Sequence, residues 1–234
     1  MKRLRFLMFL GIILIEYNLF SQDESSKLSL DFYVQPNMDK KVDVLPNSNL
    51  QYYSGKFGID CGVLINYSIS DRFKLGTGIT YINRGFTLPL GTNAADINPS
   101  YTNIKSGDIY FNENYFSIPL KMGYTLLDYH KFEISPIIGI GLDYLFNLHT
   151  RVVENYESKT ETQILNPTID GKTQRFIISG FCGLDLLYQL KDKLDLLVSP
   201  NFNSMILPLK YESNSTFKYY YWNLGCRFGL RKRI

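Results

Sequence analysis

The chain has 234 residues, of which 45% are apolar and 20% charged, and this composition excludes a disordered or fibrous protein. The formal net charge is +3, but the first 21 residues carry +2 and the last four +3. The body between them is therefore at −2, so no basic surface is expected to bind nucleic acid. Three cysteines cannot form a disulfide framework, and His130 and His149 lack metal-ligand spacing, so we expect no metal and no cofactor.

Residues 1–21 are predicted to be a signal peptide. A basic start is followed by an unbroken apolar run over 6–15, and Ser21 then precedes Gln22 at a plausible cleavage point. The run is shorter than the roughly 18–20 residues of a membrane-spanning helix, and the alternative is an N-terminal anchor helix. No later apolar stretch reaches that length. We expect export of one mature domain over 22–234, which is either soluble or a β-barrel.

From residue 27 onward, apolar side chains recur with the two-residue period of β-strands. Eight strands are predicted, at 27–35, 56–67, 73–86, 109–125, 132–147, 174–189, 194–203 and 217–230. Most are far longer than the roughly five or six residues usual in soluble proteins. Three connections are short, and the four at 36–54, 87–108, 148–173 and 204–216 are long and polar. This pattern is typical of an all-β, eight-stranded antiparallel up-and-down transmembrane barrel with short periplasmic turns and long extracellular loops.

The two faces of the predicted strands differ in chemistry. One face is apolar, with aromatic residues gathered at both strand ends like the girdles of a membrane barrel, whereas the other carries glycine and charges of both signs. A soluble ligand-binding barrel or a sandwich is the alternative. Unpaired buried charge is costly, so the near balance of sign predicts a lumen closed by ion pairs. The predicted lumen residues are Lys56, Asp60, Lys74, Arg84, Lys121, Glu133, Asp143, Arg175, Asp185, Asp195 and Arg227.

The cysteines fall on the apolar phase. Cys61, Cys182 and Cys226 belong to strands that are not neighbours in an eight-stranded meander, so their Cα atoms are expected to lie beyond disulfide reach. We expect them to act as small lipid-facing residues.

Three segments carry a family resemblance: NYFSIPLK at 114–121, YINRGF at 81–86, and the strand at 132–147. The first resembles one strand, the second resembles the end of another, and the third is similar to the fifth strand of the PorT-like outer-membrane β-barrel proteins of Bacteroidetes. The resemblance implies an eight-stranded barrel in the outer membrane of a Gram-negative bacterium, with no enzyme activity and no catalytic residues. One member of the family belongs to a protein-secretion apparatus, which implies an accessory role in secretion only weakly.

The last strand is similar to a barrel-assembly signal, which consists of a polar residue, a glycine and two spaced hydrophobic residues. Asn223, Gly225, Phe228 and Leu230 occupy these positions, although the chain continues four residues to Ile234. The match predicts recognition by the barrel-assembly machinery.

The leading functional hypothesis is a non-enzymatic integral outer-membrane protein, an interaction or structural component accessory to protein secretion or surface assembly. Its barrel would contact outer-membrane lipid, and its long loops a protein or surface-glycan partner. The first alternative is a narrow channel or transport protein. The second is a barrel hydrolase or acyltransferase with a rim site around His149, Asp143 and Glu154, although no Gly-x-Ser-x-Gly motif occurs.

Overall fold

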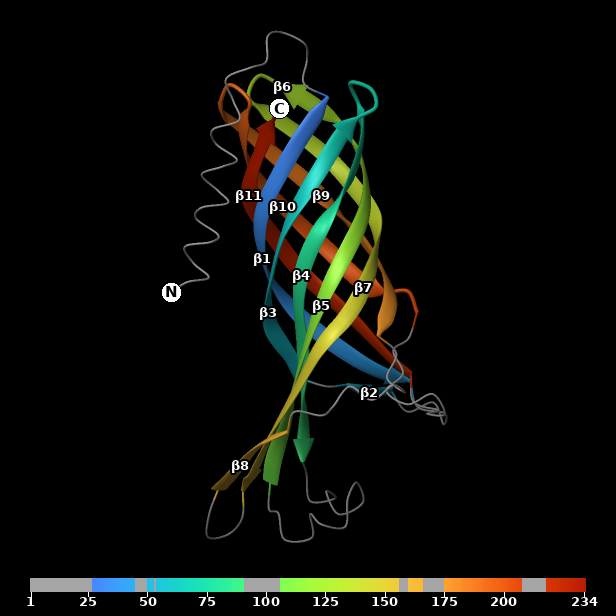
Figure 1. Cartoon of the computed structure of the whole chain (residues 1–234), viewed down its shortest axis with the longest axis vertical. Coiled ribbons are helices and arrows are strands. Elements are labelled where there is room, and N and C mark those ends of the chain that lie inside the picture. Colours follow the sequence, from blue (N-terminus) through green and yellow to red (C-terminus); the bar gives the residue numbers. More distant parts are fainter. Residues whose placement is uncertain are drawn as a thin grey trace.

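Eight long antiparallel strands form a closed barrel in the computed structural model (Figure 1). The structure describes residues 27–44, 50–52, 54–90, 106–155, 160–165, 175–207 and 218–234, so the predicted signal peptide lies outside it. The long strands are β1 (Leu28–Val44), β3 (Ser54–Ser68), β4 (Phe73–Leu90), β5 (Ser106–Tyr124), β7 (Phe132–Asn155), β9 (Phe176–Lys191), β10 (Leu194–Met205) and β11 (Lys218–Arg233). Three short strands are β2 (Leu50–Tyr52), β6 (Leu127–Tyr129) and β8 (Thr160–Leu165).

Each long strand pairs with the next long strand along the chain, and β1 closes the ring against β11. The closing seam runs from Ser29 opposite Arg233 to Val44 opposite Lys218. The predicted eight-stranded up-and-down barrel is thus confirmed. Across the described residues, no helix has the length and apolar character needed to cross a membrane.

The short turns lie together at one end of the barrel, which we call the turn end, and the long connections leave from the loop end. The strands run further toward the loop end than predicted: β1 reaches Val44, β4 reaches Leu90 and β7 reaches Asn155. The predicted loops at 36–54, 87–108 and 148–173 therefore begin too early. The polar residues of these segments favour loops, but the two-residue alternation and the backbone pairing continue into them as far as the ends of the strands.

The loop-end parts of β5 and β7, together with β8, extend beyond the barrel as an arm (Figure 1). Ser106 pairs with Asn155 at the end of the arm farthest from the barrel, and β8 pairs only with β7 among the described strands. The arm is one consequence of β7 being 24 residues long.

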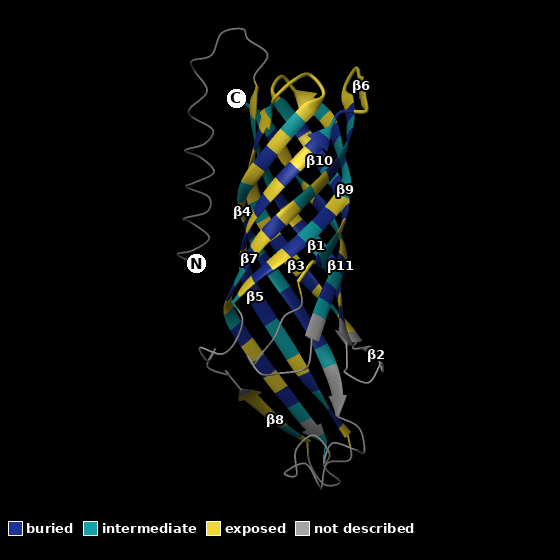
Figure 2. Cartoon of the chain, turned by 90° about the vertical axis from the view of Figure 1, so that its right-hand side faces the viewer, coloured by how far each residue is buried: buried dark blue, intermediate teal, exposed yellow. Residues whose placement is uncertain are grey.

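Burial alternates along every long strand, as the chequered colouring of Figure 2 shows. On β5, Phe116, Ile118 and Leu120 are exposed on the outside, whereas Ser117 and Lys121 on the alternate phase are buried inside. An apolar outer face around a polar interior is the arrangement of a membrane barrel, not of a soluble ligand-binding barrel.

A bulge interrupts the register of β7. Asn114 pairs with Asn147 but Tyr115 pairs with Leu145, so Phe146 is an extra residue on β7. Beyond it the two faces of the strand exchange: Leu148 is buried inside and His149 is exposed outside.

A second irregularity separates β3 from β4. Their pairing stops at Cys61 opposite Tyr81 and resumes at Gly55 opposite Phe86. Two carboxylates cross the gap, because Asp60 accepts a hydrogen bond from the backbone N–H of Asn83 (3.0 Å) and Asp39 accepts one from that of Gly85 (3.3 Å). The wall is therefore held at this point by side chains.

Candidate functional site

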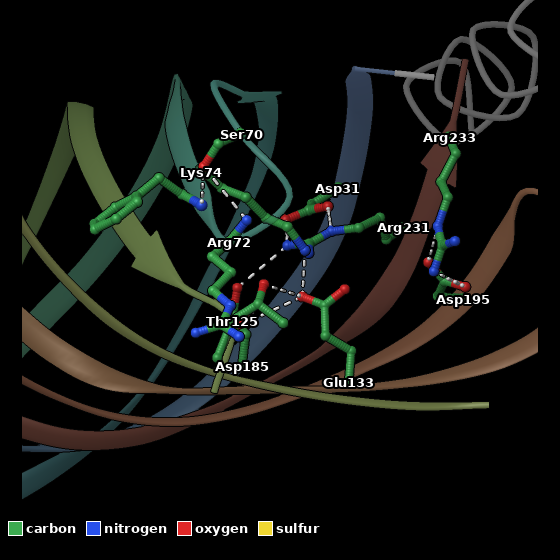
Figure 3. A network of polar contacts seen from close by, with 12 residues as sticks. Asp31, Ser70, Arg72, Lys74, Thr125, Glu133, Asp185, Asp195, Arg231 and Arg233 are labelled. Carbon is green, nitrogen blue, oxygen red and sulfur yellow. Dashed lines mark hydrogen bonds and ion pairs between the residues drawn. The ribbon is translucent and has the colours of Figure 1, made fainter. Parts of the chain in front are cut away.

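The lumen contains a four-residue ion cluster near the turn end, which we call the quartet. It consists of Asp31 from β1, Lys121 from β5, Asp185 from β9 and Arg231 from β11 (Figure 3). Arg231 donates two hydrogen bonds to Asp31 (2.6 and 2.8 Å) and one to Asp185 (3.2 Å). Lys121 Nζ lies 3.0 Å from Asp185 and 3.7 Å from Asp31. The four side chains are at most 4% exposed, so each charge is stabilised by the opposite charges beside it and not by solvent.

Two further ion pairs border the quartet at the turn end. Lys74 pairs with Glu133, whose carboxylate also accepts a hydrogen bond from Ser135 Oγ (2.8 Å). Arg233, which is partly exposed, donates to Asp195 at 2.9 and 3.2 Å (Figure 3). These pairs close the turn end of the lumen.

The middle of the lumen is organised around an amide. Arg227 Nε donates to Gln35 Oε1 (3.0 Å), and Gln35 Nε2 donates to Asp60 at 3.4 Å. The guanidinium also lies over the rings of Tyr33 (5.1 Å) and Phe181 (5.3 Å), within cation–π distance. Arg227 is therefore held by an amide and two rings, with Asp60 reached through Gln35.

An ion pair in the middle of the lumen joins Arg84 to Asp143. Arg84 Nη2 lies 3.3 Å from Asp143 Oδ2, and Ser117 donates to the other carboxylate oxygen at 2.5 Å. Both charged side chains are almost completely buried.

The loop half of the lumen is apolar, which the sequence analysis did not predict. The inward side chains that pack together there are Ile82, Phe86, Tyr115, Leu145, Ile177, Met205 and Tyr221. Glu113 lies among them with no solvent exposure and accepts hydrogen bonds from the hydroxyls of Tyr115 and Tyr221. Lys41 covers the Phe86 ring at 3.7 Å. The lumen is thus filled by an ionic layer at the turn end and an apolar layer at the loop end.

Two predicted lumen residues have different positions from those expected. Lys56 lies next to the interruption of β3 and reaches across Gly85 to donate to Asn112 on the outside of the barrel (2.7 Å). The irregular register there lets its side chain leave the inward phase. Arg175 lies one residue before β9, which begins at Phe176, and donates to the hydroxyl of Tyr144 at the loop end (3.3 Å). The other nine predicted residues are directed into the lumen.

Sequence reasoning missed two members of the quartet. The predicted lumen residues do not include Asp31, although it lies on the polar phase of the first strand. They do not include Arg231 either, which belongs to the basic last four residues but lies four residues after Arg227 and so shares its inward face. Extending the alternation to the end of the chain would have found it.

The interior has little free space. A cavity of about 20 Å³ lies in the middle of the lumen, lined among others by Gln35, Asp60 and Arg227. This is room for about one water molecule, far below the roughly 300 Å³ of small ligand sites.

The predicted enzyme constellation is not assembled. His149 is exposed on the outer face of β7 and contacts Asn147 (2.8 Å), whereas Asp143 is buried inside against Arg84. The side chain of Glu154 lies outside the described residues. Among the side chains that are described, no group of three His, Cys, Asp or Glu residues is placed to hold a metal ion.

The predicted assembly residues occupy both faces of β11. Phe228 and Leu230 are exposed on the outside, and Asn223 is buried in the lumen. Gly225 leaves room for the side chain of Gln35, which would lie 2.8 Å from a Cβ at this position. The three cysteines are free, as expected, and Cys61 and Cys182 are exposed on the outer face.

Comparison with known proteins finds similarity only among solved structures, because no protein-family model and no curated protein matches the chain. Neisserial surface protein A is 14% identical with a TM-score of 0.40, and the alignment covers 87% of this chain and 97% of that one. The outer membrane protease OmpT of Escherichia coli is 10% identical (TM-score 0.44, 92% and 99% covered). The outer membrane protein AlkL in lipid bilayers is also 10% identical (TM-score 0.44, 92% and 94% covered). Similarity of this size supports no inference about activity or partners.

Proposed function

We propose that the chain is a non-enzymatic integral protein of a Gram-negative outer membrane, exported by its signal peptide, that presents its loop end to partners outside the cell. The resemblance of 81–86 and 114–121 to PorT-like proteins supports placing it in that family. The two segments form paired strands, with Tyr81 opposite Phe116 and Asn83 opposite Asn114.

The apolar outer face supports the membrane location. Large side chains such as Ile79, Ile118 and Ile138 are more than half exposed there, which water would disfavour across so wide a surface. On β5 the apolar run from Tyr124 to Phe116 covers eight residue steps, about 27 Å along the strand at ~3.4 Å each. At a tilt of roughly 40° this is about 21 Å of height, close to the apolar band of membrane barrels.

Aromatic contacts mark both edges of this band. At the turn end, Phe73 lies 4.9 Å from Tyr124, and Phe132 lies 4.8 Å from Tyr188. The contacts at the loop end join Phe116 to Phe146 (4.4 Å), Tyr144 to Phe176 (5.0 Å) and Phe202 to Trp222 (6.2 Å). Aromatic rings favour the membrane–water interface, so the two rows support insertion to this depth.

The filled lumen is the single observation that carries the interaction role over the channel alternative. The quartet, the Arg84–Asp143 pair and the apolar layer follow one another along the axis, and a cavity in the middle of the lumen measures about 20 Å³. Packing of this kind through the described part of an eight-stranded barrel opposes a continuous water path. Function then depends on outer surfaces, of which the arm is the most prominent.

Two measurements test the proposal. Planar-bilayer recording of the purified protein is expected to give no steady conductance, and large, weakly selective currents would replace the proposal with the channel alternative. In cells, a photo-crosslinking residue at Ile164 on the arm is expected to capture a defined partner, whereas one at Ile69, which is also exposed but lies at the turn end, is not. Equal or absent capture at both positions would contradict a partner at the loop end.

A further inference from the structure

A cluster of polar side chains lies on the outside of the barrel just beyond the aromatic row at the loop end. We call it the amide patch, and it consists of Lys56, Asn83, Asn112, Asn114, Asn147 and His149. Asn83 donates to Asn112 (2.7 Å) and to Asn114 (2.8 Å), and Lys56 donates to Asn112 (2.7 Å). The Tyr81 hydroxyl, from the aromatic row, also donates to Asn114 at 2.6 Å. The patch and the aromatic row are therefore one continuous surface.

The patch spans four strands because of the two irregularities in the wall. Asn114 is opposite Asn147 and Asn112 is opposite His149, so the residues of β5 and β7 are direct neighbours. If β7 continued through Phe146 with regular alternation and no bulge, it would present Leu148 on this face in place of His149. On the other side, Gly85 has no side chain, so Lys56 can lie across it.

We propose that the amide patch binds the anionic sugar headgroup of a glycolipid in the outer leaflet, an inference that rests on the membrane location proposed above. Asn83, Asn112 and Asn147 are partly exposed, whereas Asn114 is buried and supports them from below. A partly exposed primary amide offers a donor and an acceptor side by side, which matches neighbouring hydroxyls of a sugar. The Lys56 ammonium supplies the counter-charge for a phosphate or carboxylate, and the patch contains no carboxylate of its own.

The position of the patch favours a lipid over a soluble partner. The stacked rings of Phe116 and Phe146 border it on the membrane side, and below them β5 presents Ile118 and Leu120. A ligand that fills the patch and continues down this face must have a polar head joined to hydrocarbon. A soluble protein would have to displace the lipid headgroups at the same depth.

The test uses the full mature chain in nanodiscs of phosphatidylethanolamine and phosphatidylglycerol, with and without phosphorylated glycolipid purified from a Gram-negative outer membrane. Native mass spectrometry measures which lipid stays bound after the disc is removed. The wild-type barrel is expected to retain the glycolipid. The Asn112→Ala/Asn114→Ala double variant and Lys56→Gln are each expected to retain about tenfold less, which corresponds to the loss of about one hydrogen bond.

Asn155→Ala is the matched control, because Asn155 lies on the same face of β7 but further from the membrane, beside Ser106. It is expected to retain as much glycolipid as the wild type. Equal retention by all variants, an equal loss in the control, or equal retention of phosphatidylglycerol would overturn the proposal. A chain that forms no heat-modifiable barrel in the discs would instead contradict the membrane location itself.

Discussion

Replacing Arg231 with methionine is expected to destabilise the barrel by about 3–5 kcal/mol, the usual penalty for removing one partner of a buried ion pair. The change deletes contacts of 2.6 and 2.8 Å to Asp31 and of 3.2 Å to Asp185. Lys121 alone then has to neutralise two carboxylates, and its distance to Asp31 is 3.7 Å. Because these side chains are at most 4% exposed, water cannot replace the lost guanidinium.

Two companion variants separate this charge effect from simple loss of packing. Asp31→Leu combined with Arg231→Met removes one charge of each sign, leaves the Lys121–Asp185 pair, and is expected to be nearer the wild type than the single variant. Arg233→Met is expected to lose less than Arg231→Met, because it breaks one ion pair and not two and its own side chain is 41% exposed, although it leaves the buried Asp195 without this partner. Urea unfolding in lipid vesicles provides the free energies. The reasoning is wrong if the single variant loses under 1 kcal/mol, or if the double variant is no more stable than the single one.

Three further outcomes are expected. Ile138→Arg should destabilise the barrel by about 2–4 kcal/mol because Ile138 faces mid-bilayer, whereas Ile164→Arg on the arm should be close to neutral. Equal urea midpoints for the two variants would show that Ile138 does not face the middle of the bilayer. Gly139→Ala should destabilise the barrel by about 1–3 kcal/mol, because a Cβ at this position would lie 2.3 Å from the Phe181 ring. A Cβ at Gly123 would lie 3.5 Å from its nearest neighbour, so Gly123→Ala should unfold like the wild type. Phe228→Ala with Leu230→Ala should leave the chain unassembled and degraded in the periplasm, and normal levels of the heat-modifiable form would place the assembly signal elsewhere.

The barrel itself could be predicted because its cause is a property of each strand alone. A membrane strand must be apolar on one side, so the alternation of Phe116, Ile118 and Leu120 with Ser117 and Lys121 indicates both the strand and its orientation. Strand ends were less accurate, since the β-structure continues past the membrane, where the outward side chains become polar and resemble a loop.

The lumen could be predicted only in part, because contact partners depend on register. The inward phase identified Lys121 and Asp185 as lumen residues, but no sequence signal placed Arg231 between Asp185 and Asp31. The outward position of the Lys56 side chain depends on the irregular register between β3 and β4. A single extra residue in a strand exchanges the inward and outward side chains beyond it, so such a bulge changes which residues enter the lumen.

The interruption between β3 and β4 has a mechanical consequence. Along most of the wall, backbone ladders resist shear, but between Gly55 and Cys61 the load passes through the carboxylates of Asp39 and Asp60. Carboxylate side chains can rotate, whereas a ladder of peptide groups moves as one unit. The barrel should therefore be most compliant along this line, and the amides of Asn83 and Gly85 should exchange with solvent deuterium earlier than their neighbours on β4. When a bilayer thins or thickens around the protein, this seam is where its cross-section would change first.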